Sequence, residues 1–267
     1  MLREKPDVIH FHDHSAINFL LNKKSFNTVL TVHNVGLDSY CWYKYGAVAA
    51  ISKAVQKEIL ERTGIEAVFV YNGIKLSSIK KRQQQDKGYK IVQVGRLVIE
   101  KNGQDVLLKA FSLLQKKYPD IPFSLDFIGE GDSLTFLQNL AAELDVKNVS
   151  FWGAKDRDYV YNSLAGYNLL VQPSNYEGFG LVIAEGLAAH IQVLVSSTDA
   201  AVEVIKQGRY GFSFHIGSSE DCFLQLEKIF IHGQSVDMSG LDEYLADNFD
   251  IRNTASNYVD LYEKVIV

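Results

Sequence analysis

The chain has few of the residues that mark disulfide-bonded or membrane-spanning proteins. Only two of its 267 residues are cysteine, Cys41 and Cys222, which give neither a disulfide framework nor metal-ligand spacing. No apolar run approaches the roughly 18–20 residues of a membrane span, and residues 1–6 lack the apolar core of a signal peptide. The net charge of −5 disfavours a general nucleic-acid-binding protein. We therefore expect a cytoplasmic protein whose membrane contact is at most peripheral, at the inner face of the plasma membrane.

Short β-rich runs alternate with helical patterns along the chain, which predicts an α/β fold with parallel sheets. With 47% hydrophobic residues, the chain can form two modest domains. A polar, mostly cationic stretch without apolar periodicity is typical of a linker. We expect an N-terminal domain over residues 1–75, a linker over 76–90, a second domain over 91–250, and a terminal helix in 251–267 that crosses back to the first domain.

The predicted elements place several polar loops at strand ends. Strands are expected over residues 7–12, 28–33, 47–51, 67–71, 90–94, 123–128, 149–152, 169–172 and 192–196. Helices are expected over residues 15–24, 53–62 (capped by Ser52), 103–117, 133–145, 158–165, 181–189, 200–207 and 253–266. Ligands of open parallel sheets bind at the carboxyl ends of the strands, so the loops that follow the strands are the candidate site.

The most informative stretch is Pro173–Glu185, a predicted strand end followed by a glycine-rich turn and a helix. Such a turn brings backbone N–H groups and a helix N-terminus close to a ligand, which suits a phosphate. Glu177 precedes the helix and can accept hydrogen bonds from a sugar. Glu185 lies roughly 7.5 Å along the helix axis, where it can accept two hydroxyl groups of a ribose. The stretch predicts a phosphate-linked, hydroxyl-rich ligand such as a nucleotide sugar.

A second loop, from Gly95 to Gly103, carries Arg96 and Lys101 between a strand and a helix. The planar fork of Arg96 and the point charge of Lys101 together suit a pyrophosphate, although two surface cations beside a turn would look the same. A cationic loop has no use in glycoside hydrolysis, so we disfavour the rival interpretation of Glu177 and Glu185 as a glycosidase acid–base pair.

Two further glycine-containing loops are weaker signals. Gly129-Glu130-Gly131 is equally typical of a plain turn and is not followed by the third glycine of a dinucleotide motif. Backbone groups around Gly153 can read a nucleobase edge, whereas the neighbouring Trp152 is at least as readily a core side chain.

Histidines gather near the first two strands. His33 ends the second strand, where it can bond a sugar hydroxyl or steady a charge. His10, His12 and His14 share one face only if their strand continues, so we predict no metal site.

Taken together, these segments resemble the GT-B-fold retaining glycosyltransferases of family 4, also called glycosyl transferases group 1. The resemblance runs in order along nearly the whole chain, and the Glu177–Glu185 pair is its most specific part. It also includes residues 7–12, 31–33, 50–52, 70–74, 95–101, 128–131 and 211–212, and the terminal helix. It implies two Rossmann-like domains that face a cleft, with the N-terminal domain truncated.

The resemblance also implies roles. Arg96 and Lys101 would hold the donor diphosphate and stabilise its departure, Glu177 would hold the sugar, Glu185 the ribose, and His33 would lie near the transferred sugar. The catalytic residues would be His33, Arg96, Lys101 and Glu177. The donor-binding residues would be Gly95, Arg96, Lys101, Gly129, Gly153, Glu177, Gly178, Phe179, Gly180, Leu181 and Glu185.

The reaction that the resemblance implies is sugar transfer from a UDP- or GDP-linked donor to a saccharide or lipid-linked acceptor. It proceeds with retention, without a metal or other cofactor, by front-face displacement in which the leaving phosphate helps to deprotonate the acceptor. Surface polysaccharide or glycolipid synthesis is the family's commonest use. A non-catalytic nucleotide-sugar-binding partner protein, one half of a split enzyme, and a nucleotide-sugar epimerase are the alternatives.

The sequence departs from the family pattern in three places. The run from Ala189 to Val193 lacks the usual glycine and proline, and Ala200-Ala201 stand where a glycine pair commonly approaches the diphosphate. The family's first strand and acceptor-facing loop have no counterpart, which corresponds to roughly 70–100 residues of a usual half. We therefore expect an exposed sheet edge that a second copy or a partner chain would cover.

Overall fold

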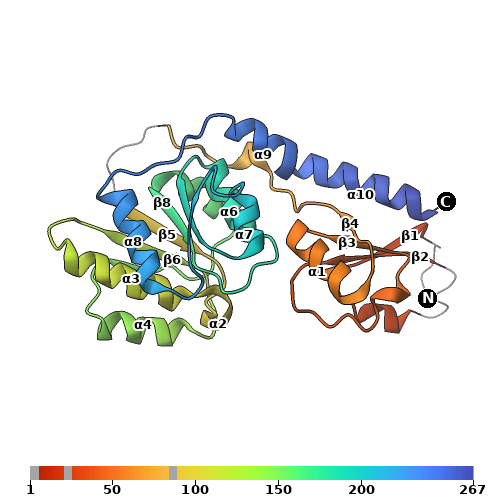
Figure 1. Cartoon of the computed structure of the whole chain (residues 1–267), viewed down its shortest axis with the longest axis horizontal. Coiled ribbons are helices and arrows are strands. Elements are labelled where there is room, and N and C mark those ends of the chain that lie inside the picture. Colours follow the sequence, from red (N-terminus) through yellow and green to blue (C-terminus); the bar gives the residue numbers. More distant parts are fainter. Residues whose placement is uncertain (1–5, 21–25, 84–88, 267) are drawn as a thin grey trace. The chain divides into compact units, whose positions relative to one another are not determined.

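The computed structural model describes residues 6–20, 26–83 and 89–266, and the chain forms two compact units (Figure 1). Unit 1 joins Met1–Ile74 to Ala246–Val267, and unit 2 is Lys75–Leu245. Each unit has its own parallel β-sheet. Among the described residues, no helix combines the length and apolar character needed to cross a membrane.

Unit 1 contains a four-stranded parallel sheet in the order β1-β2-β3-β4. One face is covered by the C-terminal helix, because Val29 and Ala49 pack against Leu261 together with Tyr258 and Tyr262. The strands are β1 (Val8–Phe11), β2 (Asn27–Val32), β3 (Ala47–Ala50) and β4 (Val68–Phe69). The helices are the 3-10 turns η1 (Ala16–Phe19) and η3 (Trp42–Lys44), α1 (Lys53–Thr63) and α10 (Ile251–Ile266).

Helix α1 begins and ends at the residues that the sequence indicates. The Ser52 side chain accepts a hydrogen bond from the Val55 N–H, and Gly64 adopts the left-handed conformation at φ 72°. The helix expected over residues 15–24 is wrong where it can be compared, since only η1 forms and residues 21–25 lie outside the described residues. Asp13 accepts hydrogen bonds from both the backbone and the hydroxyl of Ser15, which holds Ser15 in a turn instead of a cap.

Unit 2 contains a six-stranded parallel sheet in the order β10-β9-β8-β5-β6-β7. Its strands are β5 (Lys90–Val94), β6 (Ser124–Ile128), β7 (Val149–Phe151), β8 (Leu169–Gln172), β9 (Gln192–Ser196) and β10 (Phe212–Phe214). Its helices are η4 (Leu76–Ser78), α2 (Ile99–Asn102), α3 (Gln104–Lys117), α4 (Leu134–Glu143), α5 (Arg157–Ser163), η5 (Leu164–Gly166), α6 (Leu181–Ala188), α7 (Asp199–Val204) and α8 (Ser219–Phe230). Helix α9 (Leu241–Phe249) contains the boundary between the units.

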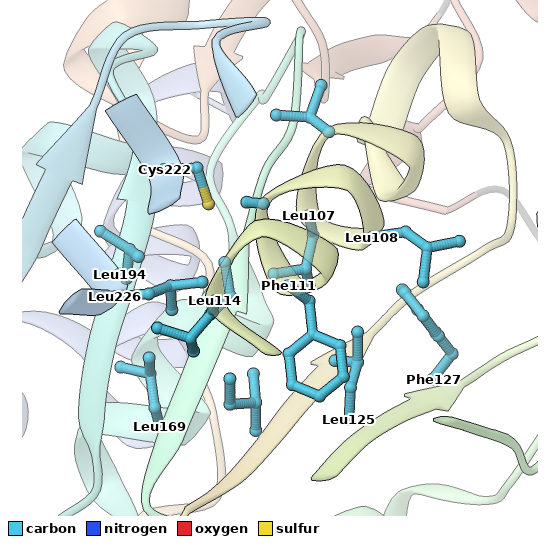
Figure 2. Packing of buried hydrophobic residues seen from close by; sticks show 14 of the residues in the cluster. Leu107, Leu108, Phe111, Leu114, Leu125, Phe127, Leu169, Leu194, Cys222 and Leu226 are labelled. Atoms are coloured by element: carbon cyan, nitrogen blue, oxygen red, sulfur yellow. The ribbon is translucent and has the colours of Figure 1, made fainter. Parts of the chain in front are cut away.

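The main core of unit 2 lies between its sheet and helix α3. Phe111 and Leu114 of α3 pack with Leu125 of β6 and Leu169 of β8, and Leu226 of α8 closes the cluster from the side (Figure 2). All five side chains are fully buried. This packing fixes the ends of β5, β6 and β8, from which the candidate loops emerge.

The strand order creates a switch point beside the central strand β5. The chain continues from β5 to β6 and β7 on one side, and then to β8, β9 and β10 on the other. The helices that follow β5 and β8 therefore lie on opposite faces of the sheet, and their loops diverge at its carboxyl edge. Ligands of such folds bind in this crevice.

The segment interpreted as a linker lies partly on unit 2. The Lys80 N–H donates to the Tyr161 carbonyl at 3.0 Å, and the Arg82 N–H donates to the Ala189 carbonyl at 2.9 Å. Residues 84–88 of this segment lie outside the described residues.

Candidate functional site

The loops that follow β5 and β8 are tied together at the switch point. The Lys101 carbonyl accepts a hydrogen bond from the Asn175 N–H at 2.8 Å, and the Asn175 side-chain amide donates to the Glu100 carbonyl at 3.1 Å. A Cβ at Gly103, where φ is +60°, would lie 2.1 Å from the Pro173 carbonyl oxygen. Only glycine permits this approach. The predicted cationic loop and the predicted glutamate loop therefore lie side by side, and Asn175, which ties them together, is a residue that sequence reasoning missed.

Three of the predicted donor-binding glycines meet at the ends of β5, β6 and β7. The Gly95 N–H donates to the Ile128 carbonyl and the Gly129 N–H donates to the Gly153 carbonyl, both at 2.9 Å. At Gly129, where φ is +149°, a Cβ would lie 1.9 Å from the Gly95 carbonyl oxygen. The structure thus packs the Gly95 and Gly129 loops backbone against backbone, an approach that a side chain at Gly129 would block.

Arg96 presents an unpaired guanidinium at this edge. Its side chain is exposed and makes no hydrogen bond or ion pair within the described part of the chain. Its carbonyl accepts hydrogen bonds from the side-chain amides of Asn102 at 2.6 Å and Gln104 at 2.9 Å, so its backbone is fixed. A positive charge on a fixed loop, without an internal partner, is suited to an external anion.

Glu177 lies in a network that orients its carboxylate. The Ser174 hydroxyl donates to Glu177 Oε2 at 3.3 Å, and Gln172 donates to the same hydroxyl at 2.9 Å. Burial raises the pKa of Glu177, while Lys101, Ser174 and the backbone N–H groups of Phe179 and Gly178 oppose the shift. The carboxylate is therefore an acceptor held by the loop itself.

Helix α6 begins directly after this loop. Gly180 precedes it with φ +90°, a conformation that glycine adopts easily, and no side chain caps the helix. Phe179 is 2% exposed, which anchors the turn, and Leu181 is the first helical residue. The first N–H groups of a helix have no intrahelical acceptor, so an uncapped N-terminus is suited to a phosphate.

Glu185 lies in the interior of α6 and is only 6% exposed. Its sole ion-pair partner among the described residues is Arg157 of α5, at 3.9 Å. Burial raises the pKa of Glu185, and Arg157 opposes the shift. Arg157 was not predicted as a site residue, because no motif surrounds it.

The residues at which the sequence departs from the family pattern lie at the end of α6 and in α7. His190 follows α6 in the left-handed conformation, with φ 57°, and its Nε2 lies 2.8 Å from Asp242 Oδ1. A non-glycine residue thus adopts the backbone conformation that glycine favours. Ala200 and Ala201 are buried in α7. Trp152 is 47% exposed, so its interpretation as a core side chain is wrong.

His33 lies in unit 1, directly after β2. Its Nε2 is 2.8 Å from His12 Nδ1. His10 contacts the Tyr262 hydroxyl and the Thr31 hydroxyl through its two ring nitrogens. In the described ranges, no cluster of three or more His, Cys, Asp or Glu side chains is arranged to hold a metal ion.

Comparison with known proteins gives a consistent family. The family model described as "Glycosyl transferases group 1" matches residues 75–238. An uncharacterized glycosyltransferase of Methanocaldococcus jannaschii is 26% identical over 77% of this chain and 60% of its own length. Phosphatidyl-myo-inositol mannosyltransferase of Mycobacterium tuberculosis is 25% identical over 77% of this chain and 58% of its own length.

Among solved structures, HepE of Anabaena in complex with UDP-glucose superposes with a TM-score of 0.80. It is 19% identical, and the match covers 96% of this chain and 79% of that chain. This likeness confirms the predicted α/β GT-B architecture. The chain spans 45–60% of the length of the first curated relatives that it matches.

Proposed function

The chain belongs to the glycosyl transferases group 1 family, and on this premise we propose that it acts on a UDP- or GDP-linked sugar. The proposed reaction transfers the sugar, with retention of configuration, to a saccharide or lipid-linked acceptor. Surface polysaccharide or glycolipid synthesis at the inner face of the plasma membrane is the proposed setting. The mannosyltransferase relative supports this setting, because its name includes the lipid phosphatidyl-myo-inositol.

One observation carries the proposal. At the switch point of the unit 2 sheet, the unpaired Arg96 and the exposed Lys101 lie on a loop hydrogen-bonded to the loop that leads into the uncapped start of α6. Cations and free helix N–H groups together are suited to a diphosphate. The Glu177 and Glu185 carboxylates, in the same loop and helix, are suited to the hydroxyl groups of a sugar and a ribose.

In the proposed mechanism, the protein binds and stabilises and forms no covalent intermediate. Arg96, Lys101 and the α6 N-terminus hold the diphosphate and stabilise the negative charge that develops as it leaves. Glu177 orients the sugar, and the role proposed for His33 of unit 1 is a hydrogen bond to a hydroxyl of the transferred sugar. The leaving phosphate oxygen accepts the acceptor's hydroxyl proton, so no protein nucleophile and no cofactor are needed.

A thermal-shift panel of UDP, GDP, UDP-glucose and GDP-mannose tests the donor site. A ligand at 100 times its dissociation constant stabilises the protein by about 2.7 kcal/mol. We expect the nucleotides of one base, either uridine or guanosine, to raise the melting temperature of the wild-type protein. The Arg96→Ala variant should lose this stabilisation. Lys109→Ala, which removes an exposed lysine paired with Asp105 on α3, is the matched control and should retain it.

Turnover with the stabilising donor then separates the candidate functions. Transfer or donor hydrolysis that is lost in Glu177→Ala supports the glycosyltransferase. No shift with any nucleotide excludes donor binding, and unchanged turnover in both variants refutes the assigned site. Binding without turnover would favour a nucleotide-sugar-binding partner protein, and an isomerised sugar without acceptor would favour an epimerase.

A further inference from the structure

Two histidines from neighbouring strands meet at the carboxyl edge of the unit 1 sheet. His12 follows β1 and His33 follows β2, and these strands pair in parallel. His12 Nδ1 lies 2.8 Å from His33 Nε2, and the ring centroids are 5.1 Å apart with a 34° interplanar angle. The contact uses one ring nitrogen of each side chain.

The His12 ring is in turn packed against the His10 side chain. The centroids of the two rings are 4.4 Å apart. His10 is fixed at both nitrogens, because Nδ1 lies 2.7 Å from the Tyr262 hydroxyl and Nε2 lies 2.7 Å from the Thr31 hydroxyl. Thr31 in turn lies 2.9 Å from the Tyr258 hydroxyl. A continuous set of contacts therefore runs from α10 through β1 and β2 to His33.

The chemistry of two imidazoles limits what this pair can do. One ring must donate an N–H and the other must accept it, so the bond couples the tautomers of the two rings: the ring that donates determines both. Nδ1 of His33 is then the nitrogen left for a ligand, since it has no hydrogen bond within the described part of the chain. The pair can carry one added proton with the bond intact, but a second proton places two N–H donors face to face.

We propose that His12 is a positioning residue for His33, which it holds in a single ring orientation and tautomer with Nδ1 left for the transferred sugar. The proposal rests on the proposed function for the role of His33 beside the sugar. The arrangement of the pair itself does not depend on that role, so the two can be tested separately.

The titratable groups around His33 give the pair a pH dependence. They are His12 and His10 on the β1 side, and Tyr258 and Tyr262 of α10 behind His10. Burial and the nearby His12 lower the pKa of His33, and burial together with His12 and His33 lowers the pKa of His10 to about 4. The bonded pair is therefore intact at neutral pH and breaks on acidification.

Imidazole ¹⁵N–¹H spectra test the positioning without any substrate. We expect wild-type His33 to show one tautomer, and His12→Ala to show a mixture with a protonation midpoint moved upward, because the neighbouring charge is gone. His12→Asn places an amide near the position of Nδ1 and should restore the single tautomer. His14→Ala removes a neighbouring ring that makes no hydrogen bond to His33, and it should leave the spectrum unchanged. The proposal would be overturned if His33 in the His12→Ala variant kept a single tautomer and an unchanged protonation midpoint.

Kinetics with the donor found by the thermal-shift panel provide the second readout. His12→Ala should lower kcat about tenfold, the loss expected for one hydrogen bond of about 1.4 kcal/mol, with the donor KM little changed. His12→Asn should recover most of kcat and flatten the acid side of the pH profile. A KM effect alone, or equal losses in the two His12 variants, would count against positioning. If no donor is turned over, the proposed function fails and the spectra still decide the role of His12.

Discussion

Glu185 is a residue at which stability and ligand binding oppose each other. Its carboxylate is buried in α6, and its only counter-charge in the described ranges is Arg157 at 3.9 Å, whose side chain is 58% exposed. A buried charge without a close partner destabilises the folded state. Because burial raises the folded-state pKa of Glu185 above its ordinary value, the native state binds more protons than the unfolded state between those two values. Stability therefore falls as pH rises through this window and stays lower above it.

We expect Glu185→Gln to raise the free energy of unfolding at pH 7 by about 1–3 kcal/mol. The gain should shrink as pH falls from the raised folded-state pKa of Glu185 toward 4.5, the ordinary pKa of the carboxyl group. Below 4.5 the side chain is neutral in both proteins and in both states, so the pH-dependent part of the gain is gone. Urea denaturation at pH 7 and pH 4 measures both effects. The same variant should lose thermal stabilisation by the nucleotide, since a neutral amide is a poorer acceptor for ribose hydroxyls.

The matched control for this charge is Glu143→Gln, an exposed glutamate in the last turn of α4. It should change neither stability nor nucleotide binding. If Glu185→Gln instead lowers stability at pH 7, the carboxylate is better compensated than its single distant partner indicates.

At the scale of elements, α3 carries the core on which the site is built. Phe111 is fully buried between α3 and the sheet (Figure 2). Leu113, two residues away on the same helix, is 38% exposed. The loop with Arg96 and Lys101 leads directly into this helix. Loss of α3 packing should therefore disturb the loop as well as the core.

We expect Phe111→Ala to lower the free energy of unfolding by about 3–5 kcal/mol, because it leaves a cavity that the packed strands cannot close. Leu113→Ala, the control on the exposed side of α3, should cost about 1 kcal/mol or less. Urea or thermal denaturation of the two variants measures the difference. Equal losses would mean that α3 is less tightly packed than the contacts show.

Some elements escaped prediction although the sequence contains their signals. Helix α8 begins at a good N-cap, because Ser218 accepts from the Asp221 N–H, and it buries Cys222 and Leu226, which are four residues apart. Helix η1 shows the converse. Its residues have a helical pattern, but the Ser15 N–H and hydroxyl both donate to the Asp13 carboxylate. Only one turn forms in the described residues. Ser15 itself has helical backbone angles and its side chain makes no cap hydrogen bond, so the predicted N-cap is absent.

At the scale of the whole molecule, the two ends of the sequence share unit 1. Helix α10 covers the face of the sheet that carries Val29 and Ala49, with Leu261 2% exposed in the contact. Unit 2 is compact without residues 246–267. The stability of the β1–β4 sheet should therefore depend on a segment that the donor site does not need.

We expect a chain that ends after Asp250 to lose hydrogen-exchange protection in β2 and β3 but to keep its thermal stabilisation by the nucleotide. Hydrogen exchange followed by mass spectrometry, with the nucleotide shift measured in parallel, checks both. As point variants, Leu261→Ala should weaken protection of β2, and Val259→Ala, whose side chain is 51% exposed, should not. Wild-type protection of β2 in the shortened chain would contradict this dependence.

The sequence was sufficient to predict the alternating α/β pattern, the strand–turn–helix motif around Glu177 and Glu185, and the cationic loop at Arg96 and Lys101. These are local features, since period, turn residues and spacing are written along the chain. The tertiary structure alone decided which strand ends are adjacent. The order β10-β9-β8-β5-β6-β7 places the β5 and β8 loops side by side, and it brought in Asn175 and Arg157 as partners. The same holds for His12 and His33, which are far apart in sequence and bonded only because β1 pairs with β2. Strand pairing and burial are long-range properties, so no local pattern contains them.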